Sequence, residues 1–290
     1  MKKSLLIFTM AGLLFVSCND DEPAATKNLT LNIANLAESA ADEQYEGWII
    51  VDGTPVSTGT FTANANGELS ASSFTIDAAM LDKATTFVLS IEPIPDNDPG
   101  PSNIKILGGD FSGTQATVSV SHGAALGSDF SASEGIVILA TPTTAEDTDE
   151  LSGIWFLDFN GGSPITGLVL PTLPSNWKYE GWAVINGQPV SSGTFSAVDA
   201  ADDADPFSGT GMAPAFPGED FVLNAPNGLT FPTDLSGQTL VISIEPSPDN
   251  NASPFAFKPL VVTMPTPAAD HTNYAMTYQA STFPTGTVTR

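Results

Sequence analysis

The chain contains one long sequence pattern twice, and this repetition constrains its fold more than any other feature. Residues 45–61 (YEGWIIVDGTPVSTGTF) return 134 positions later as residues 179–195 (YEGWAVINGQPVSSGTF), with 11 of 17 residues identical. A second block, residues 90–97 (SIEPIPDN), returns as residues 243–250 with one change in eight. This period exceeds the roughly 20–50 residues of solenoid and propeller units. The chain is therefore expected to hold a duplicated domain.

Each copy of the repeat is expected to form a β-hairpin. Asp52-Gly53 and Asn186-Gly187 are dipeptides that favour a type I′ turn, because both central residues take positive φ. Apolar side chains point to both faces of the strand before each turn, which predicts a strand covered on both sides. A glycine interrupts each outgoing strand, which is typical of a bulge.

Trp48 and Trp182 occupy the same position in the two expected hairpins. A buried tryptophan contributes a large apolar area to a core. We therefore expect both side chains to be core anchors. The alternative is that each indole forms a stacking platform for a ligand.

Many short strands, frequent turn signals and almost no helical periodicity predict an all-β fold. We expect two tandem antiparallel β-sandwich domains related by internal duplication. The expected segments are a leader over residues 1–17, a tether over 18–28, a first domain over 29–130 and a second over 131–290. Residues 29–34 alternate in polarity and predict an opening strand, with residues 168–173 as its counterpart in the second copy. The apolar segment 153–159 has no clear counterpart in the first copy and is assigned to the second domain.

The charge balance excludes one class of partner. The chain carries 33 acidic and 8 basic residues, and a leader containing Lys2 and Lys3 would take two of the basic ones with it. A surface this negative repels phosphate backbones. No nucleic-acid partner is therefore expected.

The first 18 residues resemble a bacterial lipoprotein leader. Lys2 and Lys3 precede an apolar run over residues 5–16 that is too short to span a bilayer. The run is followed by Cys18, the only cysteine in the chain, so no intramolecular disulfide can form. Residues 15–18 (FVSC) resemble a lipobox, and the acidic run that follows resembles the signal that sends lipoproteins of Bacteroidetes-type bacteria to the outer leaflet. The resemblance implies acylation of Cys18, for example with palmitate, and a surface-exposed anchor in the cell outer membrane. The alternative is an ordinary secretory signal.

The ordered motifs of each copy resemble the extracytoplasmic C-terminal domain of anti-sigma-K factors. In the first copy they are carried by Tyr45, Glu46, Gly47, Trp48, Gly53, Pro55, Val56, Gly59, Phe61, Ile91, Glu92 and Pro93, and in the second by the equivalents between Tyr179 and Pro246. The resemblance implies a β-sandwich that acts as a binding, sensing or scaffolding module. It does not extend to the cytoplasmic sigma-binding segment or the transmembrane helix of such factors, so a sigma factor is not an expected partner.

Common catalytic motifs are absent from the sequence. The two histidines, His122 and His271, do not fall at matching positions, and neither has a cysteine or a second histidine near it in the sequence. A zinc site of histidine and cysteine ligands is excluded by count. No H-E-x-x-H, G-x-S-x-G or phosphate-binding loop occurs. We expect no cofactor and no enzymatic activity.

Two glutamates recur in each copy and allow two interpretations. They are Glu46 with Glu92, and Glu180 with Glu245. A pair of carboxylates suffices for glycosidase-type acid–base chemistry. A lysine follows the second glutamate of each copy by 13 residues, at Lys105 and Lys258. We therefore expect structural ion pairs between Glu92 and Lys105 and between Glu245 and Lys258, with catalysis as the alternative.

The acidic loops raise the question of calcium, which binds several oxygen ligands. The candidate ligands are Asp199, Asp202, Asp203 and Asp205, and the turn over residues 96–98. No EF-hand spacing occurs, so no metal site is assigned. The sequence favours a non-catalytic cell-envelope lipoprotein that binds an unidentified envelope protein or glycan. The alternatives are an envelope carbohydrate-active enzyme that uses a glutamate pair, and a calcium-dependent adhesion module.

Overall fold

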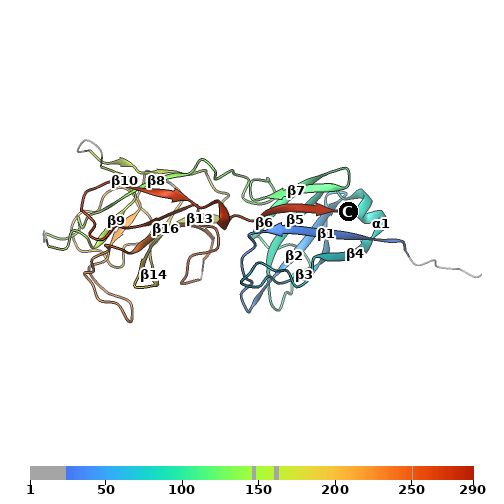
Figure 1. The fold of residues 1–290 in the computed structure, drawn as a ribbon, viewed down its shortest axis with the longest axis horizontal. Coiled ribbons are helices and arrows are strands. Elements are labelled where there is room, and N and C mark those ends of the chain that lie inside the picture. Colours follow the sequence, from blue (N-terminus) through green and yellow to red (C-terminus); the bar gives the residue numbers. More distant parts are fainter. Residues whose placement is uncertain (1–23, 146–147, 160–162, 250) are drawn as a thin grey trace, which may run out of the picture.

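A computed structural model describes residues 24–145, 148–159, 163–249 and 251–290. Figure 1 shows two β-rich bodies side by side along the long axis of the molecule. The described residues include one short α-helix, α1 (Ala78–Lys83), and one 3₁₀ turn, η1 (Ala280–Thr282). The fold is therefore all-β with two antiparallel sheet domains, as the sequence predicts. No helix in the described part of the chain has the length and apolar character needed to cross a bilayer.

The first sheet contains eight strands in the order β3-β2-β5-β6-β7-β19-β1-β4. Their bounds are β1 (Thr26–Ala34), β2 (Glu43–Val51), β3 (Thr54–Phe61), β4 (Ser73–Asp77), β5 (Thr86–Pro93), β6 (Lys105–Ser112), β7 (Gln115–Ser119) and β19 (Thr285–Thr289). All neighbours pair antiparallel. Strand β1 begins at Thr26, so the expected tether over residues 18–28 is wrong at its C-terminal end: its last three residues pair with β4.

The second sheet has the order β14-β13-β16-β17-β18-β8-β9-β15, with β12 paired to β8. Its strands are β8 (Glu134–Leu139), β9 (Gly153–Trp155), β12 (Leu168–Val169), β13 (Trp177–Ile185), β14 (Gln188–Phe195), β15 (Gly218–Asp220), β16 (Thr239–Pro246), β17 (Leu260–Thr263) and β18 (Tyr274–Tyr278). A small separate pair joins β10 (Leu157–Asp158) and β11 (Ile165–Thr166).

The two sheet orders match position by position, and the match shows that the copies exchange strands. Strand β8 follows β7 in the chain but lies in the second sheet, between β18 and β9. Strand β19 follows β18 but lies in the first sheet, between β7 and β1. Figure 1 shows β19 in dark red among the blue and green strands of the N-terminal body. The expected second domain over residues 131–290 is therefore wrong at its C-terminal end, because its last strand completes the first sheet.

The same comparison corrects the expected counterpart of the opening strand. Strand β9 occupies the place in the second sheet that β1 occupies in the first. The expected counterpart over residues 168–173 contributes only the two-residue strand β12, which pairs with β8. Residues 153–159 do belong to the second domain, and they supply the missing opening strand.

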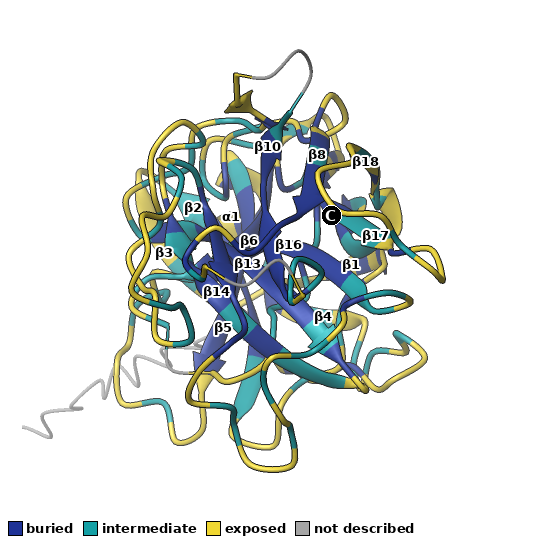
Figure 2. Cartoon of the chain, turned by 90° about the vertical axis from the view of Figure 1, so that its left-hand side faces the viewer, coloured by how far each residue is buried: buried dark blue, intermediate teal, exposed yellow. Residues whose placement is uncertain are grey.

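The two crossover segments pack against each other between the domains. Phe130, just before β8, stacks on Phe283, just before β19, with ring centroids 5.1 Å apart and planes at 10°. Phe283 also stacks on Phe257 at 5.6 Å. These three rings are at most 4% exposed and belong to one apolar cluster that contains core residues of both domains. Figure 2 shows the buried strands at the centre of the molecule, with exposed loops around them.

Both hairpins form as the sequence predicts, and their turn residues explain why. Asp52 and Asn186 adopt φ of 51° and 53°, and the glycines that follow have φ of 81° and 84°. The pairing register shifts by one residue between Gly47 and Trp48, and again at the equivalent position in β13, so each hairpin contains a bulge. A Cβ on Gly47 would lie 2.5 Å from Thr58 Oγ1, so the bulge leaves room there for glycine alone.

Candidate functional site

The repeated tryptophans lie on the face of the strand opposite the main apolar cluster. Trp48 and Trp182 are each 2% exposed. The cluster contains their strand neighbours Tyr45, Ile49, Tyr179 and Ala183, but neither tryptophan. Both tryptophans are thus buried outside the main apolar cluster. Their burial leaves no exposed indole face for a ligand to stack on.

Each indole begins a chain of hydrogen bonds that ends on a buried glutamate. Trp48 Nε1 donates to Ser90 Oγ at 2.8 Å, and the Ser90 hydroxyl donates to Glu92 Oε1. The second copy repeats the arrangement: Trp182 Nε1 donates to Ser243 Oγ at 2.8 Å, and Ser243 donates to Glu245 Oε1. Both glutamates are 1% exposed. A buried carboxylate without such donors would be costly, so the serine hydroxyls stabilise the buried position of both glutamates.

The expected ion pairs are not formed, because each lysine binds the backbone instead of the glutamate. Glu92 Oε1 accepts a hydrogen bond from Ser102 N at 2.8 Å, and Lys105 Nζ donates to the carbonyl oxygen of the same Ser102 at 2.7 Å. Glu245 and Lys258 hold the N–H and the carbonyl of Phe255 in the same way, at 2.8 and 2.7 Å. The 13-residue spacing between glutamate and lysine is the same in both copies because each pair holds one loop residue, with the carboxylate on its N–H and the ammonium group on its carbonyl.

The second domain brings three carboxylates together at this position. Glu180, Glu245 and Asp249 each offer an oxygen within 4.8 Å of the other two. Glu180 lies on β13, Glu245 near the end of β16, and Asp249 in the turn that follows. Sequence analysis paired the two glutamates but missed the aspartate. Its signal was available, since Asp249 lies in the repeated block over residues 243–250.

Each of these carboxylates has one oxygen occupied by an internal donor. Ser191 Oγ donates to Glu180 Oε1, and Asn251 N donates to Asp249 Oδ1 at 2.8 Å. Glu245 uses Oε1 for both of its bonds. Glu180 Oε2 is buried and has no hydrogen-bond partner among the described residues. The second oxygens are thus the ones available to a ligand.

Burial and mutual repulsion disfavour ionisation of this cluster. Burial, opposed by the Ser191 hydrogen bond and reinforced by the charges of Glu245 and Asp249, raises the pKa of Glu180 to about 7. Burial also raises the pKa of Glu245 and lowers that of Lys258. A cation near the free oxygens would lower the pKa of both glutamates and favour their ionised forms.

The first domain carries the same residue types in a looser arrangement. Ser57 Oγ donates to Glu46 Oε1, and Asp98 N donates to Asp96 Oδ1 at 2.9 Å. Burial, opposed by the Ser57 bond and reinforced by Glu92 and Asp96, raises the pKa of Glu46. Within the described part of the chain, however, these three carboxylates do not converge within 4.8 Å. The duplication has kept the residues, and only the second domain has closed the cluster.

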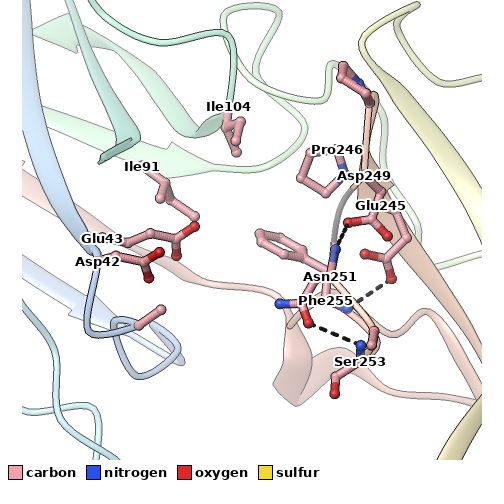
Figure 3. Close-up of a pocket in the computed structure, with 13 residues that line it drawn as sticks. Asp42, Glu43, Ile91, Ile104, Glu245, Pro246, Asp249, Asn251, Ser253 and Phe255 are labelled. Carbon is pink, nitrogen blue, oxygen red and sulfur yellow. Dashed lines mark hydrogen bonds between the residues drawn. The ribbon is translucent and has the colours of Figure 1, made fainter. Parts of the chain in front are cut away.

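A cleft of about 480 Å³ lies between the domains and reaches the edge of this cluster. Figure 3 shows Asp42, Glu43 and Ile91 of the first domain facing Glu245 and Phe255 of the second. Asp249 and Asn251 also line the cleft. Its walls therefore combine carboxylates, backbone groups and apolar side chains from both copies.

The acidic residues considered for calcium do not form one site. Asp203 binds Lys178 Nζ at 2.7 Å, while Asp202 accepts a hydrogen bond from Gly218 N at 2.9 Å. Burial is the main cause that raises the pKa of Asp202 to about 8. In the first domain, Asp96 and Asp98 form local turn bonds, from Asp98 N to Asp96 and from Gly100 N to Asp98. No cation site is apparent in either loop.

The structure also contains buried acids that sequence analysis missed. Glu219 and Asp220 on β15 are fully buried. Asp220 accepts hydrogen bonds from Thr143 N at 2.8 Å and from Trp155 Nε1 at 2.9 Å, so it ties three segments of the second domain together. Burial raises the pKa of Glu219 to about 7. No counterpart in the repeat pointed to these residues.

The remaining predicted residues lie apart from this cluster. His122 Nε2 is 3.4 Å from Asp110 Oδ1 in the first domain, and His271 Nδ1 is 3.5 Å from Asp270 Oδ2 in the second. Glu150 joins that second pair in a largely exposed group. Cys18 lies outside the described residues.

Comparison of the chain with protein-family models, with curated proteins and with solved structures finds no match in any of the three.

Proposed function

We propose that the protein is a non-catalytic binding module of the cell envelope, anchored in the outer membrane through acylated Cys18. The single observation that carries this proposal is the cleft between the domains, which draws its walls from both copies. The leader residues and the lipobox-like segment over residues 15–18 support the location. The resemblance to the extracytoplasmic domain of anti-sigma-K factors supports a binding role, and sequestration of a sigma factor is not part of the proposal.

The use of the repeated glutamates supports a module without catalysis. Glu92 and Glu245 each hold a loop backbone N–H and a buried serine hydroxyl through Oε1, which gives both glutamates a structural role. Glu46 and Glu180 are 6% and 5% exposed, and neither lines the cleft. A glycosidase needs both carboxylates at the scissile bond of its substrate, whereas only Glu245 of the pair in the second domain lines the cleft.

The chemistry of the cleft favours a neutral glycan as the ligand. Asp42, Glu43 and Asp249 offer carboxylate oxygens that accept hydrogen bonds from sugar hydroxyls. Phe255 and Ile91 add apolar surface that suits the C–H face of a pyranose ring. The negative charge of the walls disfavours polyanions such as nucleic acids and acidic polysaccharides.

Glycan binding is tested with purified full-length chain on an array of neutral bacterial and plant polysaccharides. We expect Asp42→Asn combined with Glu43→Gln to weaken retention of the bound glycan at least ~10-fold, which corresponds to about 1.4 kcal/mol. Glu134→Gln with Asp270→Asn removes the same charge from exposed positions outside the cleft and should leave binding unchanged. Absence of any retained neutral glycan, or equal binding by the cleft variant, would contradict the proposal.

The enzyme alternative is settled in the same preparations. A glycan that binds is incubated with the protein, and reducing ends are measured over time. The binding module releases none above the rate without protein. Hydrolysis that disappears in both Glu180→Gln and Glu245→Gln would replace the proposal with a glutamate-pair glycosidase.

A further inference from the structure

We propose that Glu180, Glu245 and Asp249 bind a calcium ion at the edge of the interdomain cleft, with the second domain alone carrying the site. The inference goes beyond the glycan proposal and shares only Asp249 with it, so variants at Asp42 and Glu43 test the glycan and a variant at Glu180 tests the ion. It also differs from a site in the acidic loops, where Asp202 and Asp203 bind Gly218 N and Lys178.

The carboxylates of Glu180, Glu245 and Asp249 lie close together. Their oxygens lie within 4.8 Å of one another, a spacing that one ion with oxygen ligands at about 2.3–2.6 Å can bridge. Internal donors fix the orientation of each carboxylate through a single oxygen, as described above. Serine and backbone N–H groups thus hold the ligands in place before the ion arrives.

A buried oxygen without a partner points to a ligand. Glu180 is 95% buried, since its exposed fraction is 5%, yet its Oε2 has no hydrogen bond from the described residues. A buried polar atom left unpaired costs about 1–3 kcal/mol. The neighbouring Glu245 accepts all of its described hydrogen bonds at Oε1. A cation between the carboxylates would satisfy the unpaired oxygen and relieve the repulsion.

The nearby lysines form no direct ion pair with the three carboxylates of the cluster. Lys178 Nζ binds Asp203 and Thr194, at 2.7 and 3.1 Å. Lys258 Nζ donates to the Phe255 carbonyl at 2.7 Å, and no ion pair among the described residues joins either lysine to the three carboxylates. Fully ionised, the three carboxylates and Asp203 would carry four negative charges, against two positive charges on Lys178 and Lys258. The imbalance equals the charge of one divalent cation.

The ligand set selects the type of cation. Three carboxylates without histidine or cysteine form an oxygen-only site, which suits calcium or magnesium and not zinc or copper. Calcium tolerates irregular geometry and takes 6–8 oxygens, whereas magnesium demands a near-ideal octahedron. Glu245 and Asp249 line the cleft, so the ion has a path from solvent and water molecules can complete its coordination.

The first domain provides a matched comparison within one molecule. Its equivalents Glu46, Glu92 and Asp96 share the residue types and the serine and backbone donors, and they do not converge within 4.8 Å. If calcium bound to any acidic turn, both domains would bind it. If the ion needs three converging carboxylates, only the second domain binds it.

The test is calcium titration of metal-free full-length protein by calorimetry, with terbium luminescence to locate the site. We expect one calcium per chain, with a Kd of about 10⁻⁴–10⁻³ M as in other extracellular modules, and a rise in Tm on binding. Trp182 is linked to Glu245 through Ser243, so excitation of tryptophan should sensitise bound terbium.

The variants decide between sites. Glu180→Gln should weaken calcium binding at least ~10-fold, because it removes one of three ligand charges, and Asp249→Asn should do the same. Glu46→Gln makes the identical change in the first domain and should bind as wild type does. Near-ultraviolet circular dichroism confirms that each variant is folded. Asp249 lies in a turn and is only half-buried, so Asp249→Asn serves as the second variant if Glu180→Gln does not fold.

Two results would overturn the proposal. One is the absence of any heat or Tm shift up to about 10 mM calcium, well above the expected Kd. The other is binding that survives both Glu180→Gln and Asp249→Asn, or that Glu46→Gln weakens equally. The second pattern would place the ion in another acidic segment.

Discussion

At the scale of single residues, the repeat preserves a polar network more closely than it preserves a core. Indole, serine, glutamate and a clamped loop residue recur at the same distances in both copies, with 2.8 Å between indole nitrogen and serine oxygen in each. Such networks fix one arrangement because every member needs its partner. The order Trp…Ser-x-Glu…Lys is visible in the sequence. The predicted glutamate–lysine ion pairs are wrong, because both side chains bind the backbone of one loop residue and a backbone contact leaves no signal in the sequence.

Removal of either repeated indole should destabilise the protein strongly. Trp48→Ala leaves a large cavity and takes the hydrogen-bond donor from Ser90, so we expect a loss of roughly 3–5 kcal/mol in the free energy of unfolding. Trp182→Ala should behave alike. Urea denaturation followed by circular dichroism measures both. A change below about 1 kcal/mol, together with lost glycan binding, would show that the indoles serve a ligand and not the fold.

Coupling between glutamate and lysine should persist although the two do not touch. Glu92 and Lys105 bind the N–H and the carbonyl of one residue, Ser102. Loss of one hydrogen bond should therefore weaken the other. We expect a coupling energy of about 0.5–1 kcal/mol in a double-mutant cycle of Glu92→Gln and Lys105→Met. The cycle at Glu245 and Lys258 serves as the replicate. Zero coupling in both domains would refute the clamp.

Asp202 should make the second domain less stable as pH rises. Its pKa is raised to about 8 in the folded protein, above the ordinary value near 3.9. The neutral form therefore stabilises the fold fully below about pH 4, and this contribution is lost as pH rises through about 8. Asp202→Asn keeps an oxygen acceptor for Gly218 N and cannot ionise.

The measurement is Tm of wild type and Asp202→Asn at pH 5 and pH 8. The difference in Tm, variant minus wild type, should be at least ~2 °C larger at pH 8 than at pH 5. Other buried acids affect both proteins equally, so the difference isolates Asp202. A constant difference in Tm at both pH values would show that Asp202 does not titrate in this range.

At the scale of elements, local chemistry predicts the hairpins and cannot predict the exchange of strands. Asp52-Gly53 and Asn186-Gly187 determine their turns within four residues. Strand β19, by contrast, has an alternating sequence (TGTVT) that suits either sheet equally. Its location depends on crossover segments more than 100 residues apart in sequence, whose rings meet only in the folded chain. Periodicity reports which face is buried, and it does not report against which sheet.

A mutation in an exchanged strand should destabilise the sheet that the strand joins, which contains mostly strands of the other copy. Val288 on β19 and Val137 on β8 are both fully buried, so replacement by alanine should cost about 1–3 kcal/mol in either case. Val288→Ala should loosen β1 and β7 of the first sheet, although residue 288 follows the second copy in sequence. Val137→Ala should loosen β18 and β9 instead. Hydrogen exchange with mass spectrometry resolves the two patterns, and protection lost from β17 and β18 in Val288→Ala would contradict the topology.

At the scale of the whole molecule, strand exchange makes the two copies one unit, with a cleft whose walls come from both. The stacked pair Phe130 and Phe283 closes the crossovers over a shared apolar cluster. Two domains connected only by a linker would move independently by default, and a cleft with walls from both would not keep its shape. Composition predicts the acidic surface, while the location of the cleft follows from a three-dimensional contact that no local pattern encodes.

Anchoring should depend on the single cysteine. Metabolic labelling with a fatty-acid analogue is expected to mark the wild type, and Cys18→Ser should be unlabelled and lose its membrane association, because two or more acyl chains provide stable attachment. A wild-type protein that is soluble and unlabelled would remove the lipoprotein from the proposal and leave the binding module in place.

Separation of the chain at residue 130 tests the strand exchange most directly. The fragment of residues 24–130 lacks β19, whereas the fragment of residues 131–290 contains every strand of the second sheet. The first fragment alone should therefore give the poorly dispersed amide NMR spectrum of an unfolded chain, while the second should be folded. Addition of the second fragment should restore dispersed resonances to isotope-labelled residues 24–130, and a second fragment that ends at residue 283 should not. If residues 24–130 fold unaided with dispersed resonances that the second fragment does not change, the two domains are independent and the exchange is wrong.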